Sequence, residues 1–222
     1  MEKFRADYFK KLMAGLEQVP AEEFDKVANM LLDAWEQNKQ VFIFGNGGSA
    51  ATASHFACDL GKGTLDNSYD MTEKRFKVTS LNDNVSMFTA LANDLHYDDV
   101  FTQQLRHHLE SGDIVIGITA SGNSPNVVNA IKFAKGMNAK TIGFLGFEGG
   151  KMKKLCDVSL HFPEESYQRC EDAHLIFEHL LTSYIYEKKK ERIKNMQSQV
   201  NSNPQIQQSS EQSSTIQNKV VQ

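Results

Sequence analysis

Short, continuously apolar segments alternate with segments of helical spacing along most of this chain, and this alternation limits its possible folds more than any other feature. The predicted strands are VFIFGNGGS (41–49), FKVTSL (76–81), DIVIGIT (113–119), KTIGFLG (140–146) and DVSLHF (157–162). Helices are predicted at about 7–18, 21–38, 85–92, 98–110, 124–137, 149–155 and 167–193, with another directly after the first strand. Apolar strands separated by helices are typical of a parallel sheet covered on both faces. We therefore expect a doubly wound α/β fold: a five-stranded parallel sheet flanked by helices, with N-terminal helices and a long C-terminal helix.

A change of composition near residue 195 divides the chain into two parts. Residues 1–194 are expected to form one folded domain. Residues 195–222 are rich in Gln, Ser and Asn and contain no aromatic residue. Such a segment buries too little apolar surface to offset its ordering entropy, so it is predicted to be disordered. It is either a dispensable tail or, alternatively, a segment that binds a partner.

The overall charge and the cysteines give no sign of nucleic acid, membrane or disulfides. The chain has 24 basic and 28 acidic residues, a formal charge of −4, which favours neither a nucleic acid nor an anionic membrane as partner. Its three cysteines form no CxxC pair, which favours a reducing compartment. No apolar run approaches the roughly 18 residues of a membrane span, and the charged N-terminus has no signal-peptide core. A soluble, cytoplasmic protein is expected.

The first strand ends in a glycine-rich turn, GNGGS (45–49), that leads into a helix. In parallel α/β sheets, ligands bind beyond the carboxyl ends of the strands. A helix N-terminus presents unpaired N–H groups that favour an anion. The turn matches neither GxGxxG nor a P-loop, which disfavours a nucleotide cofactor. Glycines after a strand also serve as plain turn residues, so this turn alone leaves both interpretations open.

A second turn of the same kind, TASGNS (119–124), follows the third predicted strand and precedes a helix that begins at Pro125. Its three hydroxyls belong to Thr119, Ser121 and Ser124. Ser124 alone could be explained as a helix N-cap before a proline. The other two hydroxyls have no such explanation, whereas all three could surround phosphate oxygens together with backbone N–H groups. The two turns therefore predict a phosphate site.

Four segments, GNGGS, HFACDL, ANDL and ITASGNS, occur in an order and spacing that resemble the SIS (sugar isomerase) domain, most closely the phosphoheptose isomerases. The resemblance covers about residues 5–190. It implies a five-stranded parallel α/β fold and a homotetramer with active sites at subunit interfaces. It also implies an aldose–ketose isomerase that interconverts sedoheptulose 7-phosphate and D-glycero-D-manno-heptose 7-phosphate, in a pathway that supplies heptose for surface glycoconjugates.

The resemblance also assigns roles to individual residues. Substrate contact is implied for Asn46, Gly47, Gly48, Ser49, Asp59, Asn93, Asp94 and Glu171, and the phosphate loop for Thr119, Ala120, Ser121 and Ser124. Metal ligation is implied for His55, Asp59, Glu171 and His179. Asp59 and His179 are implied as the catalytic acid–base pair. Two imidazoles and two carboxylates suit Zn²⁺ or another divalent ion, one per subunit.

The chemistry of the reaction agrees with these residue types. An aldose–ketose isomerisation moves a proton between adjacent carbons through an enediol(ate), which needs a base at carbon and an acid at the neighbouring oxygen. A carboxylate and an imidazole can share this work, and no flavin, pyridoxal or nicotinamide is required. His55 and Asp59 are four residues apart, so they lie on one helical face.

Two positions depart from the family pattern. Asp59 stands where the isomerases typically have Glu, and Glu171 stands where they have Gln. Glu171 and His179 are eight residues apart, roughly 12 Å along an ideal helix, so both could reach one ion only from opposite ends. His174 lies between them at a different angle around the helix, and a structural or interface role is expected for it.

Three functions remain open at this point. The first is phosphoheptose isomerisation, and the second is isomerisation of a hexose phosphate, a pentose phosphate or a modified heptose. The third is a non-catalytic SIS tetramer that binds protein, like the initiator-associating proteins that bind DnaA. The presence of both Asp59 and His179 favours an enzyme, because an acid–base pair has no obvious purpose in a scaffold.

Overall fold

A computed structural model describes residues 1–202, apart from the side chains of 196, 197 and 199–202. The chain divides into two units, Met1–Ile185 and Tyr186–Gln222. The described part of the second unit is the C-terminal portion of helix α8 (Tyr167–Ser202). The helix therefore continues beyond the domain boundary predicted at 194, into a segment with several good helix formers. The remainder of the predicted disordered tail, 203–222, lies outside the described residues.

The first unit contains a five-stranded parallel sheet, as the sequence predicts. Its strands are β1 (Gln40–Gly45), β2 (Lys77–Ser80), β3 (Ile114–Thr119), β4 (Lys140–Leu145) and β5 (Val158–His161). They are ordered β2-β1-β3-β4-β5, and every neighbouring pair is parallel. The chain order reverses direction between β1 and β3, so this is the topological switch point at which such sheets bind ligands. The two predicted phosphate turns follow these two strands.

The helices match the predicted segments, with differences at their ends. They are α1 (Glu2–Leu16), α2 (Ala21–Glu36), α3 (Gly48–Cys58), α4 (Val85–Asp94), α5 (Val100–His108), α6 (Pro125–Gly136), α7 (Met152–Leu155) and α8. A π-helical turn, Asp59–Gly63, continues α3 and was not predicted from the sequence. Such turns are frequent at functional sites. No helix within the described part of the chain is long and apolar enough to cross a membrane.

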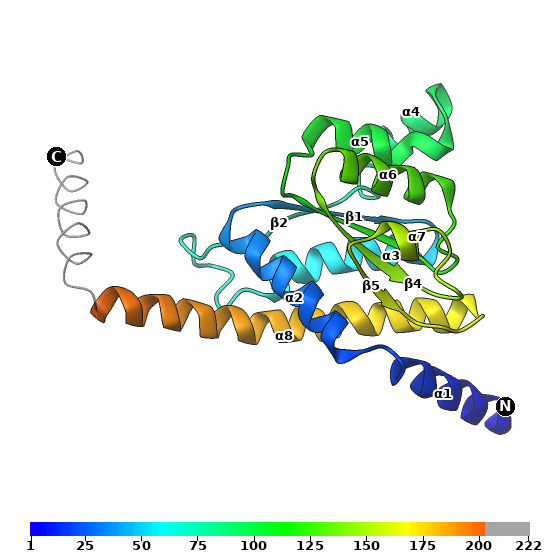
Figure 1. Cartoon of the computed structure of the whole chain (residues 1–222), viewed down its shortest axis with the longest axis horizontal. Helices are drawn as coiled ribbons and strands as arrows, with labels where there is room; N and C mark the ends of the chain where they lie inside the picture. The colour runs from blue at the N-terminus through cyan, green and yellow to red at the C-terminus, as the bar shows by residue number, and fades with distance from the viewer. Residues whose placement is uncertain (203–222) are drawn as a thin grey trace. The chain divides into compact units, whose positions relative to one another are not determined.

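Helices cover both faces of the sheet (Figure 1). Helices α2, α3 and the part of α8 up to Ile185 lie on one face, and α5, α6 and α7 lie on the other. Strands β1, β3 and β4 are buried almost throughout, which explains why they are continuously apolar rather than alternating. The core between the sheet and helices α5 and α6 includes Phe42, Phe44, Phe101, Val115 and Ile131.

Three phenylalanines connect α3 and α8 to the sheet. The ring centroids of Phe56 on α3 and Phe144 on β4 are 5.8 Å apart, and those of Phe144 and Phe177 on α8 are 5.9 Å apart. All three residues are buried, with an exposed fraction of at most 1%. Helices α3 and α8 thus both pack on β4 through Phe144. This packing sets the separation between the residues next to Phe56 on α3 and those next to Phe177 on α8. We call these three residues the aromatic column.

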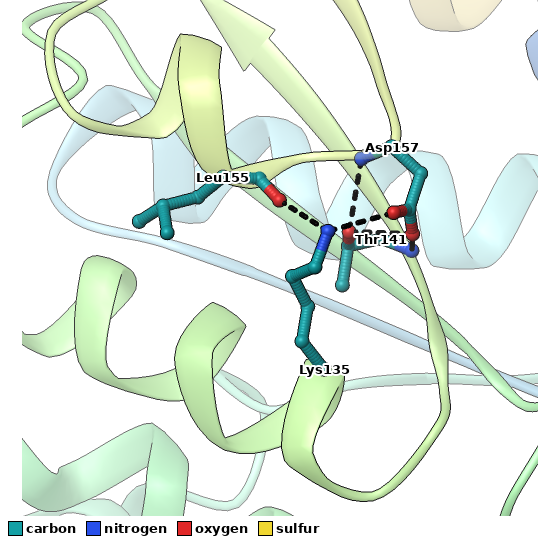
Figure 2. A network of polar contacts seen from close by, with 4 residues as sticks. All are labelled: Lys135, Thr141, Leu155 and Asp157. Carbon is teal, nitrogen blue, oxygen red and sulfur yellow. Dashed lines mark hydrogen bonds and ion pairs between the residues drawn. The ribbon is translucent and has the colours of Figure 1, made fainter.

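A polar network fixes the start of the edge strand β5 (Figure 2). The Asp157 carboxylate accepts hydrogen bonds from Lys135 Nζ and from both the backbone N–H and the hydroxyl of Thr141, each at 2.8 Å. Lys135 Nζ also donates to the carbonyl of Leu155. Burial alone would raise the pKa of Asp157, but the hydrogen bonds from Lys135 and Thr141 outweigh it and hold the pKa below its usual value.

Candidate active site

A pocket of about 130 Å³ lies at the carboxyl ends of β1 and β3. It is lined by Asn46, Ser49, Ile118, Thr119, Ala120, Ser121, Ser124, Tyr167 and Glu171. Residues of both predicted phosphate turns thus meet in one pocket, together with Glu171 from α8. Tyr167 lines it as well, although the sequence analysis did not single it out.

The loop after β3 is held in shape by its neighbours. Gly122 has a φ of +64°, and a Cβ there would lie 2.0 Å from the carbonyl oxygen of Gly149, so only glycine fits. The carbonyl of Gly122 accepts a hydrogen bond from Met152 N–H at 3.1 Å, and that of Ala120 accepts one from Gly146 N–H at 3.0 Å. The hydroxyls of Thr119 and Ser124 lie 3.3 Å apart. The loop therefore presents its hydroxyls from a rigid support.

The groups beside the pocket that could bind an anion are helix ends rather than cationic side chains. Helix α3 begins at Gly48 and helix α6 at Pro125, so the N-termini of two helices are next to the pocket. None of the described residues that line it is a lysine or an arginine. Unpaired N–H groups and hydroxyls are thus the available donors for a phosphate.

Glu171 adds a carboxylate beside the first turn of α3. A Cβ added to Gly48 would lie 2.3 Å from the carboxylate carbon of Glu171. Only the absence of a side chain at Gly48 allows this approach.

Asn46 is held by two residues that the sequence analysis did not single out. Its Oδ1 accepts hydrogen bonds from Tyr97 Oη and from Asn126 Nδ2, each at 2.9 Å, and its own Nδ2 donates to Asn126 Oδ1 at 2.9 Å. Tyr97 precedes α5 and Asn126 is in α6, so only the folded chain brings them together. A second hollow, of about 310 Å³, lies beside Asn46 and is lined by Gly45, Asn46, Gly47, Ala50, Asn82, Val85, Phe88 and Tyr97.

Asn93 and Asp94 lie elsewhere. They form the end of α4, where Asn93 Nδ2 donates to Asp94 Oδ1 at 2.9 Å, and both are exposed. Neither lines either of the two hollows described above. Within one chain, these two residues therefore lie apart from the pocket that gathers the residues of the two predicted phosphate turns.

Two histidines and two carboxylates gather between α3 and α8. Each of His55, Asp59, Glu178 and His179 offers one atom such that all four atoms lie within 4.8 Å of one another. Asp59 Oδ2 is 3.6 Å from His55 Nε2 and 3.8 Å from His179 Nε2. Glu178 Oε1 is 3.6 Å from His55 Nδ1 and 3.3 Å from His179 Nε2. We call these four residues the His–carboxylate cluster, and its donor types could hold a divalent metal ion.

The cluster contains three of the four predicted ligands, with Glu178 in addition and Glu171 elsewhere. Glu171 lies at the pocket lined by the two predicted phosphate turns, which we call the phosphate-loop pocket. The helical rise separates Glu171 from His179 by roughly 12 Å along α8. The sequence analysis missed Glu178. Its position directly before His179 was the available signal, but only the packing of α8 on α3 shows that its carboxylate faces His55.

Glu178 occupies the buried end of the cluster. Its side chain is 0% exposed, whereas those of His55 and His179 are 45% and 50% exposed. Neither carboxylate oxygen of Glu178 has a hydrogen-bond partner among the described residues. Burial, and secondarily the charge of Asp59, raises the pKa of Glu178 to about 8.

His174 lies outside the cluster and belongs to the core. It is fully buried, and its ring packs near those of Phe144 and Phe177. Burial lowers its pKa to about 4. Of the two roles expected for it, the structural one agrees with this position.

Comparisons with known proteins show the family and the fold of the chain. The SIS domain family matches residues 6–146. The phosphoheptose isomerase of Aliarcobacter butzleri is 36% identical over 177 residues, covering 79% of this chain and 90% of the relative. That of Helicobacter pylori is 36% identical, covering 79% and 87%. The solved structure of the phosphoheptose isomerase of Neisseria gonorrhoeae is 28% identical, with a TM-score of 0.74 over 83% of this chain and 97% of that one.

Proposed function

Since the chain belongs to the SIS domain family and, within it, to the phosphoheptose isomerases, we propose that it interconverts sedoheptulose 7-phosphate and D-glycero-D-manno-heptose 7-phosphate. The observation that carries this proposal is the separation between the two parts of the site. The phosphate-loop pocket is lined by Ser49 of α3 and by Tyr167 and Glu171 of α8. The His–carboxylate cluster is formed further along the same elements, by His55 of α3, Asp59 of the π-helical turn that continues it, and Glu178 and His179 of α8.

The separation suits a long sugar phosphate. Ser49 and His55 are six residues apart, roughly 9 Å along α3, and Glu171 and His179 are roughly 12 Å apart along α8. A substrate whose phosphate is at one end and whose carbonyl is at the other can place the phosphate at the loop and the carbonyl at the cluster. A seven-carbon 7-phosphate has this arrangement.

Asp59 and His179 are the proposed acid–base pair. Their side chains come from separate helical segments and approach to 3.8 Å. In the proposed reaction, the Asp59 carboxylate takes a proton from C1 of the ketose while His179 donates a proton to the C2 oxygen, which gives the enediol. Removal of the O1 proton and return of a proton to C2 then yields the aldose. No external oxidant or reductant is consumed.

The His–carboxylate cluster is also a proposed site for Zn²⁺ or another divalent ion, held by His55, Asp59 and His179. Two imidazoles and carboxylate oxygen are the donors that Zn²⁺ prefers, and their spacing fits one ion. When bound, such an ion polarises a substrate carbonyl oxygen. The same residues without the ion retain a carboxylate and an imidazole for proton transfer.

A homotetramer in the cytoplasm is proposed as the working form. Helices α1 and α8 expose large apolar side chains, namely Phe4, Phe9, Met13, Ile176, Leu180 and Tyr184, as expected of surfaces that are covered by another subunit. Cys58, Cys156 and Cys170 are all free thiols, which favours a reducing compartment. Asn93 and Asp94 could then complete the active site of a neighbouring subunit.

The decisive assay is proton NMR in D₂O with sedoheptulose 7-phosphate as substrate. We expect new signals of the aldose 7-phosphate, together with deuterium incorporation at the carbon that receives the transferred proton. Free sedoheptulose is the matched control and should react far more slowly, because it lacks the group that the loop binds. No turnover with the 7-phosphate would contradict the proposal. Turnover with a pentose or hexose phosphate alone would reassign the substrate.

A further inference from the structure

Glu178 is the one member of the His–carboxylate cluster to which neither the proposed acid–base chemistry nor the proposed metal site gives a role. We infer that Glu178 is a metal ligand, and that it binds a divalent cation together with His55, Asp59 and His179, in place of Glu171. The inference rests on the metal site of the proposed function, but it does not depend on the isomerase reaction.

The first support is the burial of a polar group without a partner. The Glu178 side chain is 0% exposed, and neither of its oxygens makes a hydrogen bond within residues 1–202. A buried carboxylate without compensation costs several kcal/mol, so native proteins pair such groups or bind a metal with them. A bound cation would supply the partner that the Glu178 carboxylate otherwise lacks.

The second support is the spacing of the cluster atoms. Ligands of a tetrahedral zinc ion, at about 2.0–2.2 Å from the metal, lie roughly 3.4 Å from one another. Glu178 Oε1 lies 3.3 Å from His179 Nε2, and Asp59 Oδ2 lies 3.8 Å from the same nitrogen. The four offered atoms lie within 4.8 Å of one another, so a small inward movement would complete the coordination.

Two other ways to satisfy Glu178 fit less well. Protonation would neutralise the charge of Glu178, but it would leave the two imidazoles and the Asp59 carboxylate of the cluster without a shared partner. Ion pairs with protonated imidazoles, at 3.6 Å from His55 and 3.3 Å from His179, would leave both oxygens of Glu178 without a hydrogen bond. A cation shared with both imidazoles satisfies all four groups at once.

Glu171 cannot take this place, although it is on the same helix. Its carboxylate lies against Gly48 and lines the phosphate-loop pocket. Glu171 does not belong to the group of four residues whose ligand atoms lie within 4.8 Å of one another. The two carboxylates of α8 therefore belong to different ends of the site.

The inference is tested by metal binding without substrate. Zn²⁺ affinity is measured by competition with a chromophoric chelator for the full chain, for Glu178→Gln and for the matched variant Glu171→Gln. Loss of an outer-shell partner typically costs about 10–100-fold in metal affinity, and we expect Glu178→Gln to lose at least 100-fold as a direct ligand. Glu171→Gln should bind Zn²⁺ as the wild type does. In the Co²⁺-substituted protein, only Glu178→Gln should change the visible spectrum.

A stability measurement separates ligand loss from misfolding. Without metal, Glu178→Gln should be at least as stable to urea as the wild type, because a neutral amide replaces a buried carboxyl group that has no hydrogen-bond partner among the described residues. On addition of Zn²⁺ it should gain less stability than the wild type, since stabilisation follows affinity. Glu178→Met provides the same comparison if the glutamine variant folds poorly.

Wild-type affinity in Glu178→Gln, or an equal loss in Glu171→Gln, would overturn the inference. A crystal structure of the wild-type chain with Zn²⁺ gives the answer without any substitution: a Glu178 oxygen at about 2.0–2.2 Å from the ion supports the inference, and a longer separation overturns it. Because no sugar is present in these experiments, they can fail while the isomerase assay succeeds, and the reverse also holds.

Discussion

The ring centroids of His55 and His179 lie 4.9 Å apart at 82°, although one residue is on α3 and the other on α8. The two imidazoles therefore face a common space whose carboxylates come from both helices. Two segments that are distant in the sequence thus contribute side chains to one cluster. Substitutions at the cluster, at the pocket and in the core test what these groups do.

Replacing either member of the acid–base pair should remove catalysis and leave the fold intact. We expect Asp59→Ala and His179→Ala each to lower kcat by about 10²–10⁴-fold, the usual contribution of a positioned acid or base. The double variant should lose much less than the product of the two effects, because the residues act as a unit. Steady-state kinetics measure the losses, and circular dichroism checks the fold. Near-wild-type turnover in either single variant would contradict the assigned roles.

Gly48→Ala should disturb the pocket rather than the fold. The new methyl group would meet the end of the Glu171 side chain, which is flexible, so the free energy of unfolding should change by less than about 1 kcal/mol. The displaced carboxylate would move towards the phosphate, and we expect KM to rise about tenfold, equivalent to about 1.4 kcal/mol.

The double variant Gly48→Ala/Glu171→Ala should recover most of this KM, because the clash is gone. Gly136→Ala is the matched control, since a Cβ there meets no atom within 4 Å. An unchanged KM in Gly48→Ala would show that Glu171 does not influence phosphate binding.

His174 should make the fold sensitive to mild acid. Its pKa is lowered to about 4 by burial, whereas an unfolded histidine titrates near 6.5, so the unfolded state binds the proton more readily. Stability is therefore full above about pH 6.5 and is lost as the pH falls towards 4, by on the order of 3 kcal/mol from this residue. Urea unfolding at a series of pH values should show a shallower loss in His174→Leu. An identical pH dependence in both proteins would contradict the prediction.

The contribution of Asp157 to folding stability should be lost in a lower pH range than that of His174. Hydrogen bonds from Lys135 and Thr141 hold its pKa below the usual value despite partial burial, so its stabilisation is present above the unfolded pKa of about 4 and is lost as the pH falls further. Because the side chain is 42% exposed, we expect Asp157→Asn to cost only about 1 kcal/mol at neutral pH. Thermal unfolding at pH 7 and pH 3 measures the effect, which should largely disappear at the lower pH.

The sequence predicted the sheet and the loops because those features are encoded locally. Buried strands such as Ile114–Thr119 are recognisable from their apolar runs, and the hydroxyls of Thr119 and Ser124 belong to one short turn. The partners of Asn46 and the position of Glu178 could not be predicted in this way. They depend on how α5, α6 and α8 pack, and a side chain one position away on α8 would face a different neighbour.

The aromatic column carries a consequence for how this enzyme could change over time or by design. Phe56 follows His55 in sequence, and Phe177 precedes Glu178, while both rings rest on Phe144. The separation between His55 and Glu178 is thus set by the volume of the hydrocarbon side chains packed between the two helices. Substitutions at Phe144 could therefore change the spacing of the His–carboxylate cluster without altering any side chain that a sugar contacts.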